Sequence, residues 1–113
     1  MVNVTNLTKK KAPKIQWQLV CEEILGKKYK LSIVLAESNL MEKINSRYRN
    51  KKEPAKVLSF SYSKNEGEIF LNTKYNKNTL FLLFIHGLLH LKGYKHSRKM
   101  ETLEKKYIAM FKN

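Results

Sequence analysis

Residues 78–96 have the sequence NTLFLLFIHGLLHLKGYKH, and we expect the domain to be organised around them. Apolar side chains occupy nearly the whole circumference of a helix over Asn78–Lys92, which is typical of a helix buried at the centre of a domain. Gly93 follows where glycine commonly ends a helix, because it adopts positive φ without strain. We therefore expect the other elements to pack around this helix.

The flanking segments predict three further helices and at least three strands. Apolar residues at helical spacing favour helices over Lys14–Leu25, over residues 40–48 with Ser38 or Asn39 as the cap, and after a cap at Ser97. Strand patterns favour Tyr29–Ala36, Val57–Tyr62 and Glu68–Asn72, and Val2 and Val4 could add a short strand. This order predicts a single α+β domain over residues 1–113, with a mixed sheet packed around the central helix.

The chain is strongly basic. Twenty-three Lys and Arg stand against nine acidic residues among 113, which gives a formal net charge of +14. Such a charge favours a polyanionic partner, either nucleic acid or an anionic membrane surface. A solvated Lys-rich surface is the alternative, because the charges are spread along the chain. All nine acidic residues are Glu, so any chemistry must proceed without an aspartate.

Three features predict a cytoplasmic protein that does not span a membrane. Cys21 is the only cysteine, so no intrachain disulfide can form, and we expect it to be buried or half-buried on the first helix. Met1–Lys14 is polar and lacks the apolar segment of a signal peptide. The longest apolar run, Leu80–Leu91, is interrupted by histidines and is shorter than the about 20 residues of a membrane-spanning helix.

All three histidines lie within residues 86–96. His86 and His90 are four residues apart, so on a helix they project from one face with Cβ atoms about 5–6 Å apart. A turn at Gly93 can bring His96 to the same point. Three imidazoles with an open fourth position form a catalytic zinc site, although nickel, copper and iron also suit imidazole. The alternative is a set of buried histidines held only by hydrogen bonds.

The spacing of the histidines matches the long zinc motif of metzincin proteases, His-Glu-x-x-His-x-x-Gly-x-x-His. In those proteases the residue after the first histidine is the Glu that acts as general base. Gly87 occupies that position here, so the peptidase mechanism would lack its proton acceptor. The sequence therefore disfavours peptide hydrolysis.

Residues 86–96 resemble the signature of the YbeY family of bacterial metal-dependent endoribonucleases, which has the pattern H-G-x-L-H-L-x-G-Y-D-H. Three further stretches agree with the family in order and spacing, and the resemblance covers residues 30–111. They are Ile44-Asn45-x-x-Tyr48-Arg49 (family L-N-x-x-Y-R), Pro54-x-x-Val57-Leu58-Ser59-Phe60 (family P-T-D-V-L-S-F) and Gly67-Glu68-Ile69 (family G-D-I).

The resemblance implies an α+β fold and a zinc-dependent hydrolase that cuts single-stranded RNA in ribosomal RNA maturation and ribosome quality control, with ribosomal proteins as further partners. By position, it makes His86, His90 and His96 the ligands of one zinc ion. It makes Arg49 the functionally important arginine, for which we expect a catalytic role at the phosphate.

Other residues near the motifs have less specific expected roles. Glu68 is a candidate orienting or proton-accepting carboxylate. Five lysines flank the motifs and could hold the RNA backbone by charge, and three aromatic residues could stack on bases or pack in the core. The lysines are Lys51, Lys52, Lys56, Lys92 and Lys95, and the aromatic residues are Tyr48, Phe60 and Tyr94.

The chain departs from the family pattern at its aspartates and is shorter at its N-terminus. Lys56 and Lys95 stand where the family has Asp. A carboxylate beside His96 could orient its imidazole, so its loss predicts weaker metal binding or lower activity. Two alternatives follow: a non-catalytic ribosome- or RNA-binding factor with a structural metal, and hydrolysis of another substrate at the same metal.

Overall fold

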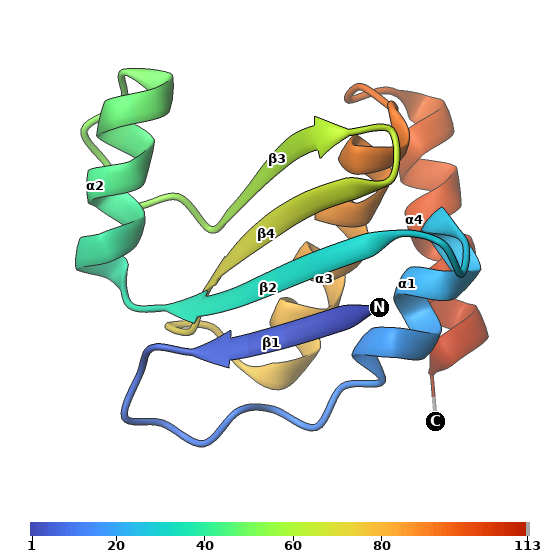
Figure 1. The fold of residues 1–113 in the computed structure, drawn as a ribbon, viewed down its shortest axis with the longest axis horizontal. Coiled ribbons are helices and arrows are strands. Elements are labelled where there is room, and N and C mark those ends of the chain that lie inside the picture. Colours follow the sequence, from blue (N-terminus) through green and yellow to red (C-terminus); the bar gives the residue numbers. More distant parts are fainter. Residues whose placement is uncertain (113) are drawn as a thin grey trace.

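A computed structural model describes residues 1–112 and has the predicted α+β architecture (Figure 1). Its mixed sheet has the strand order β1-β2-β4-β3. Strand β2 runs parallel to both of its neighbours, β1 and β4. Strand β3 runs antiparallel to β4. The strands are β1 (Val2–Asn6), β2 (Lys30–Ala36), β3 (Val57–Ser63) and β4 (Glu66–Asn72). The helices are α1 (Trp17–Leu25), α2 (Ser38–Arg49), α3 (Lys77–Lys92) and α4 (Arg98–Phe111).

The helix predicted to be central is α3. It contacts β3 and β4 of the sheet and both α1 and α4, and its buried residues join the main core. Phe84 is fully buried and meets Trp17 of α1 edge to face, with ring centroids 4.9 Å apart. The Asn76 side chain caps the helix by accepting a hydrogen bond from the Thr79 backbone N–H.

Strand β2 has buried residues on both faces. Leu31, Ile33 and Leu35 face the main core with α3. Ala36 points to the opposite face and joins a second, smaller cluster with Met41 of α2 and Leu58 of β3. Figure 1 shows α2 standing apart from the other three helices. This second cluster places α2 against the sheet beside β3.

Two predicted helix starts are wrong. The first helix begins at Trp17 rather than Lys14, because the Ile15 and Trp17 N–H groups donate to carbonyls two residues earlier in a tight turn. The cap of α2 is Glu37, whose side chain makes no capping hydrogen bond. Ser38 instead accepts a hydrogen bond from the Asn72 side chain. The predicted Ser97 cap of α4 is confirmed, since its hydroxyl accepts from the Met100 N–H.

Two further expectations concern membrane-spanning helices and the number of domains. Among residues 1–112, no helix is long and apolar enough to cross a membrane. The single-domain assignment stays a prediction, and its last residue, Asn113, lies outside the described residues.

Gly67 of β4 lies in close contact with β3 and α3. A Cβ atom there would overlap the buried Tyr29 hydroxyl and lie 2.9 Å from the Phe60 carbonyl oxygen and 3.1 Å from a Leu91 methyl carbon. A carbonyl oxygen belongs to the backbone and cannot rotate away. The absence of a side chain at this position is therefore a packing requirement.

We predict that Gly67→Ala lowers the free energy of unfolding by about 1–3 kcal/mol, because the added methyl overpacks the core. Urea unfolding followed by circular dichroism measures the change. Ser61→Ala is the control, since Ser61 is exposed and pairs with Gly67 across the β3–β4 ladder. If Gly67→Ala unfolds at the same urea concentration as Ser61→Ala, the packing argument is contradicted.

Candidate metal centre

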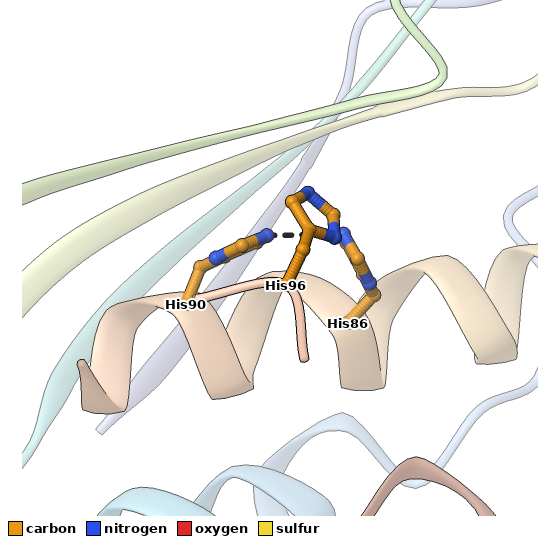
Figure 2. A group of neighbouring side chains, drawn as sticks. All are labelled: His86, His90 and His96. Atoms are coloured by element: carbon orange, nitrogen blue, oxygen red, sulfur yellow. Dashed lines mark hydrogen bonds between the residues drawn. The ribbon is translucent and has the colours of Figure 1, made fainter. Parts of the chain in front are cut away.

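The three histidines meet on one side of α3 although they come from two segments. His86 and His90 project from the same face of α3, and His96 reaches them from the segment between α3 and α4 (Figure 2). One nitrogen of each ring lies within 4.8 Å of the others. His86 and His90 are half-buried and His96 is exposed. The group could therefore hold a metal ion that is open to solvent on one side.

The turn that returns His96 depends on Gly93. This residue has φ 109°, a left-handed conformation that favours glycine. Its N–H donates to the His90 carbonyl, and the Tyr94 N–H donates to the Leu89 carbonyl. These bonds satisfy the carbonyls at the end of α3 and reverse the chain. The predicted glycine stop is confirmed, and the same turn brings the third imidazole to the first two.

Contacts of the Nδ1 atoms fix the ring orientations of two imidazoles, those of His86 and His90. His90 Nδ1 is 2.9 Å from the Tyr94 carbonyl oxygen, which can only accept, so Nδ1 carries the hydrogen. The lone pair of His90 is then on Nε2, which lies 3.1 Å from His86 Nε2. Burial lowers the pKa of His90, while the Tyr94 carbonyl opposes that shift. A neutral His90 with a free Nε2 is the form that binds a metal.

Glu104 provides the corresponding contact for His86. Its Oε2 lies 3.4 Å from His86 Nδ1, and the side chains of His86 and Glu104 are 21% and 17% exposed. A carboxylate accepts from Nδ1–H, which leaves His86 Nε2 facing His90 Nε2. Two nitrogen lone pairs at 3.1 Å repel each other unless a cation or proton lies between them. The donor set and its outer hydrogen bonds therefore fit a metal ion.

Sequence reasoning did not identify Glu104. A usable signal was present, because Glu104 lies on the apolar face of α4 with the buried Met100 and Tyr107. A carboxylate on the inward face of a helix needs a partner. The family pattern predicts that the loss of a carboxylate next to His96 weakens the centre. Lys95 is exposed there, and the carboxylate contact is made by α4 to a different histidine.

Arg49 lies at the same cleft as the histidines. The three histidines, Arg49 and residues 57–60 of β3 line a cavity of about 490 Å³, which we call the metal cleft. Arg49 is the last residue of α2, and Asn50 ends that helix in the left-handed conformation with φ 56°. Packing of α2 against the sheet thus brings an exposed guanidinium to the edge strand above α3.

Glu68 does not belong to this site. Its carboxylate accepts hydrogen bonds from the Tyr62 and Ser32 hydroxyls. In the ladder it lies between Gly67 and Ile69, which face α3, so its side chain points to the opposite face of the sheet. The suggested role of Glu68 near the histidines is therefore wrong, because strand alternation directs it away from them.

Some of the lysines and aromatic residues near the motifs line the cavities, and others lie elsewhere on the surface. Lys51 and Lys56 line a second cavity that adjoins the metal cleft, whereas Lys52, Lys92 and Lys95 are exposed and line neither cavity. Phe60 lines the metal cleft and packs edge to face against Tyr48, with centroids 5.6 Å apart. Tyr94 is half-buried, with the Lys99 ammonium 5.6 Å from its ring centroid.

The fold and the site define an α+β domain whose central helix carries two histidines four residues apart and whose third histidine follows a glycine turn, a group that could hold a metal ion. The family model described as "Endoribonuclease YbeY" matches residues 2–112. The chain therefore belongs to the YbeY family.

Individual relatives agree with this assignment. A protein named Endoribonuclease YbeY from Ehrlichia ruminantium is 40% identical over 69% of this chain and 63% of its own length. The chain thus spans just under two thirds of that relative. A protein of the same name from Ehrlichia chaffeensis is 36% identical over 88% of this chain and 75% of its own length. A solution structure of a Thermotoga maritima protein shares the fold, with a TM-score of 0.65, 23% identity, and coverage of 96% of this chain and 87% of its own.

We predict that Glu104→Ala lowers metal affinity about 10–100-fold, because His86 loses the acceptor that orients it. Competition with a chromophoric chelator measures the dissociation constant, and circular dichroism of the metal-free protein checks folding. Glu104→Gln keeps an acceptor oxygen and is expected to recover part of the affinity.

Glu101→Ala is the matched control, because Glu101 is an exposed carboxylate on the same helix. It removes the same charge without contact to a histidine. Equal affinities for the Glu101 and Glu104 variants would mean that net charge alone determines the effect.

Proposed function

We propose that this protein is a zinc-dependent endoribonuclease that hydrolyses single-stranded RNA, acting in the cytoplasm on ribosomal RNA during its maturation. One observation carries the proposal: Arg49 and the three histidines line the same open cleft. A candidate metal site and a cation for phosphate thus lie together on a protein with a net charge of +14. The names of its relatives, Endoribonuclease YbeY, agree with this chemistry.

Zinc is the proposed ion because three neutral imidazoles are a common ligand set of catalytic zinc. The residues that would hold it are His86, His90 and His96. When bound, such an ion acts as a Lewis acid toward a phosphoryl oxygen and makes water a competent nucleophile near neutral pH. His96 is exposed, so the ligand set is open on the side of the metal cleft. A closed site would favour a purely structural metal, and this openness favours catalysis.

Arg49 is proposed to bind the phosphate that is cut. Its planar guanidinium can donate two parallel hydrogen bonds to phosphoryl oxygens and stabilise the negative charge that grows on them. Within residues 1–112, those that line the metal cleft include no carboxylate, and Glu104 lies behind His86. The same composition leaves no general base of the protease type.

The packing of Gly87 strengthens the case against peptide hydrolysis. A Cβ at this position would lie 3.2 Å from both Ser59 Oγ and a methyl carbon of Ile69. The Ser59 hydroxyl donates to the Gly87 carbonyl across this contact. The helix therefore lies close to the sheet where a metzincin has its glutamate, and a side chain here would require Ser59 and Ile69 to shift.

We predict that wild-type protein binds about one zinc ion per chain and cuts single-stranded RNA, and that His90→Ala and chelation each abolish cutting. Elemental analysis measures the metal, and gel electrophoresis of end-labelled RNA measures the fragments. Cutting that persists in both cases would point to a contaminating nuclease. Intact metal binding and RNA binding without fragments would favour the non-catalytic binding factor.

We predict that Arg49→Ala lowers the cleavage rate about 10²–10³-fold and leaves the metal content unchanged, since the guanidinium stabilises charge in the transition state without touching the metal. Single-turnover kinetics with saturating protein separate this effect from weaker binding. Arg47→Ala is the matched control, because Arg47 lies on the same turn of α2 with its guanidinium 5.8 Å from the Tyr48 ring and does not line the cleft. A similar loss of cleavage rate in both variants would mean that Arg49 contributes only its positive charge and has no specific role at the phosphate.

A further inference from the structure

We propose that the cavity adjoining the metal cleft, here called the side pocket, holds the base of a nucleotide next to the phosphodiester that is cut. This inference rests on the proposed function, because it assigns the substrate's neighbouring nucleotide to a site. The side pocket has a volume of about 460 Å³, and its lining residues include Arg49, Lys51, Lys56, Tyr75, Leu82 and His86. Small-molecule sites range over about 300–1,000 Å³, so one nucleotide fits.

The side pocket continues directly from the metal cleft. Arg49 and His86 line both cavities, so a strand whose phosphate contacts Arg49 has its neighbouring nucleotide at the side pocket. Arg49 is the last residue of α2, and His86 lies on α3. Both residues lie where the two cavities adjoin. This continuity gives the pocket a defined place along a bound chain.

One part of the lining is apolar although it is open to solvent. Leu82 is 41% exposed, unlike Leu80, Phe84 and Ile85 of the same helix, which are buried. The half-buried Tyr75 also belongs to the pocket lining. Single-stranded RNA presents unstacked bases, which bind by stacking on aromatic and apolar side chains. The exposed leucine and the tyrosine therefore form a surface that binds a base more favourably than it binds a phosphate.

The charged groups of the lining divide in a way that suits a nucleotide. Arg49, Lys51 and Lys56 are cations that attract phosphate oxygens, and the Lys56 ammonium lies 5.8 Å from the Tyr75 ring centroid. Glu53 and Glu104 also line the pocket, and their carboxylates would repel a phosphate. Carboxylates accept hydrogen bonds from the amino and imino groups of bases. The base therefore belongs inside the pocket, and its phosphates belong near the cations.

Binding to two polymers of equal charge tests the proposal. The probes are a fluorescent oligouridine and an abasic ribose-phosphate oligomer of the same length, titrated by anisotropy under conditions where no fragments form. Wild-type protein is expected to bind oligouridine about tenfold more tightly, because its bases can stack on the pocket lining and the abasic oligomer has no bases. Tyr75→Leu and, separately, Leu82→Ser are expected to remove most of that preference. The dissociation constant for the abasic oligomer should not change in either variant.

Tyr62→Leu is the control, because Tyr62 is an exposed tyrosine whose hydroxyl bonds Glu68 on the far face of the sheet. This variant should keep the full preference for oligouridine. Circular dichroism checks that each variant folds, and the exposed Leu82 keeps the test valid if Tyr75→Leu does not fold. A preference that persists in both pocket variants, or no preference in wild type, overturns the proposal. If the expected binding pattern appears without any cleavage, the base site stands and the endonuclease proposal falls.

Discussion

The close contact of α3 with the sheet at Gly87 sets the geometry of the site. With no side chain at this position, the helix approaches β3 and β4 until Ser59 bonds its backbone. His86 and His90 are thereby held along the edge strand β3, where the cleft opens. A helix displaced from the sheet would move both imidazoles away from Arg49, which another element supplies. The geometry of the site is thus a consequence of helix–sheet packing in the core.

The groups of the site come from four parts of the fold. The helix α3 supplies two imidazoles, the following turn supplies the third, α4 supplies the Glu104 carboxylate, and α2 supplies Arg49 from across the sheet edge. None of these groups lies on a long loop. Sites on packed elements keep their geometry without help from a ligand, which suits electrostatic stabilisation of a phosphoryl group.

The features that could be predicted from sequence are those that depend on local spacing. The central helix, its stop at Gly93 and the α+β order follow from periodicity and from glycine geometry, and the motif around His86 suffices to indicate the family. The role of Glu68 was misjudged because proximity to a motif does not fix which face of a strand a side chain occupies. Glu104 was missed because its contact with His86 joins two helices, and no local pattern encodes their packing. The start of α1 at Trp17 was missed because a tight turn after Pro13 competes with helix formation.

The turn at Gly93 has a consequence for how the stability of this protein should be measured. Because His96 stands outside the helix that carries His86 and His90, an ion held by all three would cross-link the start of the α3–α4 connection to the centre of the domain. Ligands that bind only the folded state add free energy that grows with their concentration relative to the dissociation constant. The free energy of unfolding measured for this chain would then depend on the concentration of trace metal in the buffer. Melting temperatures are comparable between samples only at equal metal activity.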